Sequence, residues 1–248
     1  MMERITSRKN PLIQQVRKLL ASKKEREHTG LFVADGTKLL AEALAYDPGI
    51  HTVILTDDVH ISLPPQVQVV RVPEEIMEYI SPMEAPQGAI FLCRIPQQEE
   101  WNVKRGMLLL DGIQDPGNLG TILRTADALD VPVVLMEGCA DPYNHKTVRA
   151  SMGAVFRVKP IQSTWEQVRQ KCAAANIPVA VTALSSRAKD IRQAKLSAMA
   201  VVIGSEGQGV RNEILEQADC ELIIPMNSHC ESLNAAIAAT IVMWQMRN

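Results

Sequence analysis

The chain has 248 residues, of which 46% are hydrophobic, and its formal net charge at pH 7 is −2. This length allows one large domain or two modest ones, and the hydrophobic content supports a proper core. No apolar run is long enough to span a bilayer, the histidines are not at metal-ligand spacing, and the five cysteines include no C-x-x-C pair. We therefore expect a cytoplasmic protein with reduced thiols, no membrane segment and no metal site.

Positive charge is concentrated at the beginning of the chain. Residues 1–40 carry nine Lys and Arg against four Asp and Glu, a net charge of +5, whereas the other residues sum to −7. A turn at Asn10-Pro11 leads into a predicted helix with an apolar face and with Arg17 and Lys18 outside it. This asymmetry indicates contact with a polyanion, although a solvated helix face would have the same composition.

Predicted strands and helices alternate over residues 31–93. Strands are predicted at 31–34, 53–56, 67–72 and 88–93, and helices at 37–46 and 73–80. The alternation predicts a small α/β domain over residues 1–95. Residues 96–105 are polar, contain Pro96 and lack sustained periodicity, so we interpret them as an interdomain linker.

Residues 106–248 form the predicted second domain. Strands are expected at 107–111, 131–136, 158–161, 178–182, 200–203 and 221–224, and helices at 119–129, within 139–157, at 165–175 and after Asn234. Apolar strands that alternate with helices predict a parallel sheet covered on both faces. The last helix is apolar nearly all round, so we expect it to pack on its own domain and on a second subunit.

Two loops near the end of the chain predict a ligand crevice. Strands 200–203 and 221–224 each lead through a loop into a helical pattern. The first loop contains three glycines, which allow backbone N–H groups to approach a ligand closely. The second leads to Ser232, a natural helix N-cap. Loops at the carboxyl ends of adjacent parallel strands commonly form the binding crevice of an open α/β sheet.

Polar residues at the strand ends restrict the chemistry of this crevice. They are Asn118, Arg124, Glu206, Ser232 and Asn234. Hydrogen-bond donors, one carboxylate and a permanent cation suit the orientation of a hydroxyl near an anionic backbone better than metal hydrolysis. By residue type alone, Asn118 could instead cap a helix and Glu206 could be an ordinary surface residue. The chain lacks the dinucleotide-binding, P-loop and G-x-S-x-G patterns.

Three motifs in order carry a family resemblance. DGIQDPGNLGTILRTADA at 111–128, VIGSEGQGV at 202–210 and IPMNSHCESLNAA at 224–236 resemble those of SpoU/TrmH ribose 2′-O-methyltransferases of the SPOUT superfamily. RASMGAVF at 149–156 also fits that family. SRKNP at 7–11 and FVADG at 32–36 resemble its ancillary RNA-binding domain, which is related to certain ribosomal proteins. The resemblance covers nearly the whole chain.

The resemblance implies a trefoil knot in the second domain, a homodimer, and S-adenosylmethionine bound against the knotted loops. The implied cofactor-binding residues are Thr182, Ala183, Leu184, Gly204, Ile224, Met226, Ser232 and Leu233. The RNA, expected to be ribosomal with transfer RNA as the alternative, would contact Arg8, Lys9, Arg17, Lys18, Lys146 and Arg149.

The family assigns Arg124 the activation of the ribose hydroxyl. Because a guanidinium stays protonated, we hypothesise that Arg124 chiefly binds the adjacent phosphate and stabilises the developing alkoxide. Asn118 and Glu206 would position Arg124, and Ser232 and Asn234 would order the loop and the hydroxyl. A non-catalytic RNA-binding or ribosome-assembly factor on the same fold is the alternative, and the basic beginning of the chain disfavours a small-molecule enzyme.

Overall fold

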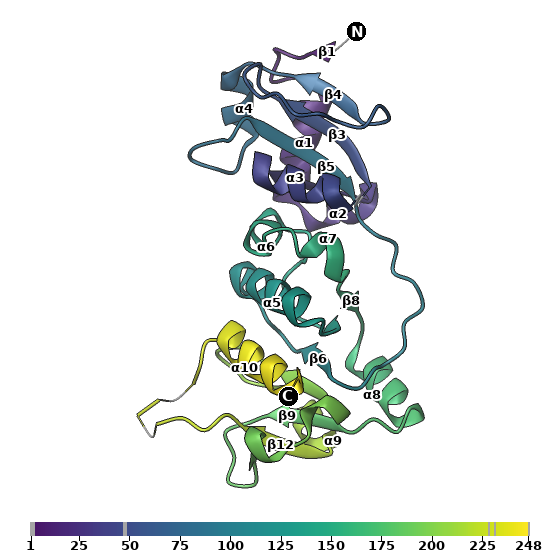
Figure 1. Ribbon diagram of the computed structural model, residues 1–248, viewed down its shortest axis with the longest axis vertical. Coiled ribbons are helices and arrows are strands. Elements are labelled where there is room, and N and C mark those ends of the chain that lie inside the picture. Colours follow the sequence, from purple (N-terminus) through teal and green to yellow (C-terminus); the bar gives the residue numbers. More distant parts are fainter. Residues whose placement is uncertain (1–2, 47–48, 228, 231, 248) are drawn as a thin grey trace. The chain divides into compact units, whose positions relative to one another are not determined.

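The computed structural model describes residues 3–46, 49–227, 229–230 and 232–247 (Figure 1). Their contacts group into unit 1, Met1–Gln97 with Asp141–Arg157, and unit 2, Gln98–Ala140 with Val158–Asn248. Each unit contains its own sheet and helices, so the predicted α/β class is confirmed. The domain boundaries at 95 and 106, and the knot, stay predictions.

Unit 1 is built on a mixed five-stranded sheet. Its strand order is β1-β4-β3-β5-β2, with β1 Glu3–Arg4, β2 Leu31–Asp35, β3 Ile50–Leu55, β4 Gln68–Arg71 and β5 Ala89–Arg94. β4 pairs in parallel with β1 and β3, whereas β5 runs antiparallel to β2 and β3. The short edge strand β1 was not predicted.

Helices cover both faces of this sheet. They are α1 Pro11–Ala21, α2 Lys23–Thr29, α3 Thr37–Tyr46 and α4 Glu74–Ile80. The predicted turn at Asn10-Pro11 is confirmed, since the Asn10 side chain accepts from the N–H of Leu12 at 2.9 Å and Pro11 occupies the first helical position. Ser22 then caps α2 as a separate helix. One core lies under α1 and α4, and a second lies under α3.

The segment 141–157 completes the second core of unit 1. It forms α6 His145–Ala150 and leads into α7 Val155–Val158. The ring of Phe32 lies 5.0 Å from that of Tyr143 and 6.3 Å from that of Phe156, measured between centroids. The strand predicted at 158–161 is wrong at its start, because Val158 ends α7 and the strand begins at Ile161.

Unit 2 is built on a parallel sheet, as its apolar strands predicted, and β10 adds a seventh strand that was not predicted. The strand order is β10-β12-β9-β11-β6-β7-β8. The strands are β6 Met107–Leu110, β7 Val133–Leu135, β8 Ile161–Gln162, β9 Val179–Thr182, β10 Lys189–Asp190, β11 Ala200–Ile203 and β12 Cys220–Ile223. Every pairing between these strands is parallel. The carboxyl ends of the strands therefore meet at one edge of the sheet.

Helices cover both faces of this sheet too. α5 Pro116–Leu129 and α10 Ala235–Arg247 pack on one core, and α8 Trp165–Ala174 and α9 Asn212–Gln217 pack on the other. Two 3₁₀ turns, η1 Ile191–Gln193 and η2 Leu196–Ala198, precede β11. Figure 1 shows α10, in yellow, beside α5. No helix in the described part of the chain is long and apolar enough to cross a membrane.

A buried ion pair ties segment 141–157 to α2. Arg26 is 3% exposed, and its guanidinium contacts Asp141 Oδ2 through Nε at 2.8 Å and Nη2 at 2.6 Å. The same guanidinium donates to the Leu19 carbonyl at the end of α1. Each partner would be a buried, uncompensated charge without the other, so the pair fixes the position of this segment.

We predict that Arg26→Ala lowers the free energy of unfolding by about 3–5 kcal/mol, because it leaves the largely buried Asp141 carboxylate without its cationic partner. Lys23→Ala is the control, since its ion pair with Glu27 is exposed and contributes less than about 1 kcal/mol. Urea unfolding followed by circular dichroism measures both. Equal effects of the two substitutions would contradict this role of the buried pair.

Candidate active site

A pocket of about 640 Å³ lies at the carboxyl ends of β9, β11 and β12. Its walls are the loops that follow these strands and the beginning of α10. All eight residues predicted to bind the cofactor line it: Thr182, Ala183, Leu184, Gly204, Ile224, Met226, Ser232 and Leu233. The crevice expected after strands 200–203 and 221–224 is therefore present, although the expectation that these strands are adjacent is wrong, because β9 lies between β11 and β12. The binding role of its lining residues stays a prediction.

The glycine loop after β11 folds tightly on itself. Ser205 and Gly209 exchange backbone hydrogen bonds of 3.1 and 2.9 Å, and Gly209 has a φ of +68°. A Cβ atom at Gly204 would lie 2.1 Å from the carbonyl carbon of Gly209 and 2.2 Å from the nitrogen of Val210. Gly204 is thus required by the approach of the loop's own backbone, whereas a Cβ atom at Gly207 would have no neighbour within 4 Å in the described part of the chain.

A chain of hydrogen bonds joins three segments beside the pocket. Asn118 Nδ2 donates to Glu206 Oε1, and Asn234 Nδ2 donates to Asn118 Oδ1 at 3.0 Å. Asn234 Oδ1 accepts from the backbone N–H groups of Ala236 and Ile237 at 3.0 and 3.3 Å. This Glu206–Asn118–Asn234 chain connects the glycine loop with the first turns of α5 and α10.

The two ends of this chain fix the orientation of both amides. An ionised Glu206 carboxylate can only accept, so it must face the NH₂ group of Asn118. The N–H groups at the start of α10 can only donate, so they must face the oxygen of Asn234. Rotating either amide by 180° would place two donors or two acceptors against each other.

Neither Asn118, for which capping was the alternative to a site role, nor Ser232, the predicted cap, caps its helix. Asp115 caps α5 by accepting from the N–H of Asn118 at 2.7 Å, so Asn118 is not the cap and its side chain is free to reach Glu206. Asn234, not Ser232, caps α10. The prediction for Ser232 is wrong because α10 begins at Ala235, which places Asn234 at the capping position.

Arg124 is exposed on α5, six residues beyond Asn118. Within the described ranges, no hydrogen bond or ion pair involves its guanidinium. The bonds of Asn118 go to Glu206 and Asn234 instead, so the positioning of Arg124 by Asn118 and Glu206 stays a prediction.

An ion cluster next to the pocket was not predicted. Asp111 follows β6, is 1% exposed, and accepts from Arg211 through its backbone N–H at 2.9 Å and its Nε at 2.6 Å. Arg211 also contacts Glu137 at 2.9 Å. Burial opposes ionisation of Glu137, but its own backbone N–H and Arg211 outweigh this and lower its pKa. The signal for this cluster in the sequence was Asp111, a carboxylate at the end of an apolar strand.

The six predicted RNA contacts all belong to unit 1. Arg8 and Arg17 place their guanidinium carbons 4.8 and 4.3 Å from the ring centroid of Tyr79. The side chains of the others are exposed, and they are Lys9, Lys18, Lys146 and Arg149. The aromatic partner, Tyr79, was missed by the sequence analysis.

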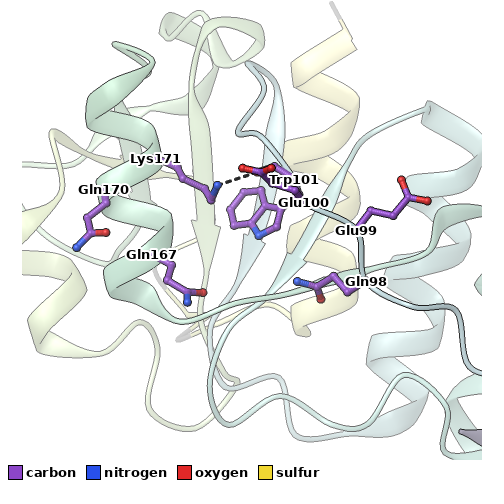
Figure 2. A pocket seen from close by; sticks show the side chains of 7 residues that line it. All are labelled: Gln98, Glu99, Glu100, Trp101, Gln167, Gln170 and Lys171. Atoms are coloured by element: carbon purple, nitrogen blue, oxygen red, sulfur yellow. Dashed lines mark hydrogen bonds between the residues drawn. The ribbon is translucent and has the colours of Figure 1, made fainter.

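A second hollow of unit 2, of about 450 Å³, contains none of the predicted site residues. Figure 2 shows its amide-rich lining, and Lys171 there lies over the Trp101 ring at 5.2 Å and donates to the Trp101 carbonyl at 2.9 Å. Among the residues that the structure describes, no three His, Cys, Asp or Glu side chains are arranged to hold a metal ion.

Comparison with known families gives two matches. The model of the SpoU rRNA Methylase family matches residues 106–244, and the MRM3-like substrate binding domain matches residues 10–90. The two matches cover most of both units.

Known proteins resemble the chain over nearly its full length. The 23S rRNA (guanosine(2553)-2′-O)-methyltransferase RlmP of Bacillus subtilis is 35% identical over 99% of this chain and 100% of its own. The crystal structure of an AdoMet-bound rRNA methyltransferase from Sinorhizobium meliloti has a TM-score of 0.85 and 30% identity, covering 99% of this chain and 97% of that one. A putative RNA methyltransferase of the TrmH family from Porphyromonas gingivalis has a TM-score of 0.83 and 33% identity, covering 94% and 96%.

We predict that Gly204→Ala lowers the free energy of unfolding by at least about 3 kcal/mol, because the new methyl group overlaps backbone atoms that cannot move independently. Gly207→Ala is the matched control and should change stability by less than about 1 kcal/mol, because its surroundings are open. Thermal unfolding of both variants measures the difference. A Gly204→Ala protein as stable as the control would show that this loop conformation is wrong.

Proposed function

Because the chain belongs to the SpoU rRNA methylase family, we propose that it transfers a methyl group from S-adenosylmethionine to a ribose 2′-hydroxyl of ribosomal RNA. The chain is an RNA methyltransferase, and S-adenosylmethionine is its methyl donor. The ribose specificity and the ribosomal substrate are supported by the 35% identity to a 23S rRNA 2′-O-methyltransferase along the whole chain. We place this activity in the cytoplasm.

The observation that carries the proposal is the pocket lined by all eight predicted cofactor residues. Its volume of about 640 Å³ lies within the usual range for small-molecule sites, about 300–1,000 Å³. Apolar side chains such as Leu222 and Ile224 suit a flat adenine ring, and the exposed loop around Gly207 leaves the backbone open to polar groups. The lining therefore fits a nucleoside-containing donor.

S-adenosylmethionine supplies a methyl group activated by its sulfonium charge. The residues of the chain must place a ribose hydroxyl in line with that methyl group and stabilise the oxygen as its proton passes to water. The carbon–oxygen bond forms as the carbon–sulfur bond breaks, and the thioether S-adenosylhomocysteine leaves. Arg124 stabilises the ribose oxygen and binds the adjacent phosphate, because its guanidinium stays charged and can donate to two oxygens at once. The Glu206–Asn118–Asn234 chain holds the glycine loop and the start of α10 in place, and Ser232 contributes its hydroxyl at the pocket wall.

The exposed face of α10 supports a homodimer. Ile237 and Trp244 are 52% and 61% exposed, and seven residues separate them, so they lie on the same face of the helix. Burying two large apolar side chains against a second copy would stabilise the assembly, and sedimentation of the full-length chain measures it.

Tritiated S-adenosylmethionine tests the activity directly. We expect label in 23S or 16S ribosomal RNA from cells that lack this protein, and ribose methylation mapped to a single nucleotide. Label in transfer RNA alone would contradict the ribosomal substrate, and the absence of label in any RNA would favour a non-catalytic RNA-binding factor.

We predict that Arg124→Lys lowers kcat at least 100-fold with little change in donor affinity, because an ammonium cannot reproduce the two-pronged contact of a guanidinium. Single-turnover transfer and calorimetry with S-adenosylmethionine measure the two quantities separately. Near-normal turnover of this variant would contradict the role of Arg124.

Exchanging the donor and the acceptor of the Asn118–Glu206 hydrogen bond tests the Glu206–Asn118–Asn234 chain. Asn118→Asp alone sets two carboxylates against each other, and we expect about a 100-fold loss of transfer from the displaced loop. Asn118→Asp combined with Glu206→Gln restores a donor opposite an acceptor, so transfer should recover to within about 10-fold of the original. Glu206→Gln alone is the control, because its amide oxygen can still accept from Asn118. A double variant as inactive as Asn118→Asp would contradict a positioning role.

A further inference from the structure

Unit 1 contains a small pocket that the proposed reaction does not use. Its volume is about 110 Å³, and it lies between the end of α1, the carboxyl end of β2, the residues after α4, and α6. Its lining includes Leu20, Asp35, Met83, His145, Lys146 and Arg149. A water molecule takes up about 30 Å³ in the liquid, so the pocket holds the volume of only a few water molecules. It therefore suits one small planar ring better than a larger ligand.

Two polar groups at this pocket can still interact with a ligand. Asp35 accepts a hydrogen bond from Ser81 Oγ at 2.6 Å, and burial raises its pKa while Ser81 and Arg149 oppose that shift. His145 Nδ1 is buried and has no hydrogen-bond partner among the residues that the structure describes. Buried polar atoms are nearly always paired, so an unpaired nitrogen in a pocket wall indicates a missing partner. Burial, followed by the nearby cations, lowers the pKa of His145 and favours the neutral ring.

Two cations line the same pocket from α6. Lys146 and Arg149 are exposed and three residues apart, so they share one face of the helix. In the described part of the chain neither forms an ion pair. The pocket thus combines polar groups inside with positive charge outside. A nucleotide is complementary to this arrangement, because its base has a polar edge and its phosphate is an anion.

The cluster of Arg8, Arg17 and Tyr79 is close in sequence to two residues of this pocket. Arg17 precedes Leu20 by three residues in α1, and Tyr79, in the last turn of α4, precedes Met83 by four residues. Guanidinium planes and an aromatic ring are the surfaces on which unstacked bases of single-stranded RNA lie. An RNA strand could therefore continue from the pocket onto this cluster.

We propose that this pocket binds one unstacked nucleobase of the RNA substrate, with Lys146 and Arg149 on the flanking phosphates. The inference rests on the proposed function in taking RNA as the nucleic acid. A base with an exocyclic amino group can donate to the Asp35 carboxylate, as cytosine does, whereas uracil presents a carbonyl at the same position. The pocket therefore prefers cytosine to uracil.

Methyl NMR of the full-length protein with 5′-mononucleotides tests this proposal. We expect CMP to shift the Met83 methyl signal, identified by its loss in Met83→Leu, in a saturable manner, and UMP to bind several-fold more weakly. Asp35→Asn should weaken CMP binding about 10-fold through the loss of a charged acceptor. A Met83 signal that CMP leaves unmoved, or that inorganic phosphate shifts equally, would overturn the proposal.

A matched pair of variants, Lys146→Ala and Lys24→Ala, tests the pocket independently of whether Asp35→Asn folds. Both remove an exposed lysine of unit 1, but only Lys146 lines the pocket. CMP binding should weaken several-fold in Lys146→Ala and remain unchanged in Lys24→Ala. Equal weakening in both variants would mean general charge attraction and would overturn the base pocket.

The outcomes separate this inference from the proposed function. Saturable CMP binding without methyl transfer to any RNA would support the pocket and contradict the enzyme. Methyl transfer without CMP binding at Met83 would contradict the pocket alone.

Discussion

The geometry of the candidate active site depends on one chain of hydrogen bonds between a carboxylate and a helix N-terminus. Glu206 accepts at one end, the N–H groups that begin α10 donate at the other, and Asn118 and Asn234 lie between them. Because neither end can reverse its role, both amides have a single satisfied orientation. Three segments far apart in the sequence are thereby held as one surface beside the pocket.

The parallel sheet of unit 2 provides the frame for this surface. Its strands all end at one edge, so the loops after β9, β11 and β12 meet there and enclose about 640 Å³. The glycine loop is held from both sides, by Glu206 toward α5 and by the Asp111–Arg211 ion pair toward β6. A site built in this way needs little rearrangement to accept a donor molecule, which favours binding and alignment together.

Much of this arrangement could be predicted from the sequence because strand ends in a parallel sheet converge. The apolar strands and the loops after them were sufficient to identify the crevice, whereas its lining residues were implied by the family resemblance. Other features depend on contacts that periodicity does not encode. Tyr143 and Phe156 pack in unit 1 although they lie between segments of unit 2, and nothing in their spacing indicates which core they join. The last helix was expected after Asn234 and does begin at Ala235, so Asn234 rather than Ser232 occupies the capping position.

A crystal structure of the full-length chain grown with S-adenosylmethionine tests the central claim most directly. We expect the adenosine between Ala183, Ile224 and Leu233, with Asn118 still bonded to Glu206 and Asn234. A donor bound instead in the hollow beside Trp101, or an empty crevice with these three side chains apart, would contradict the account.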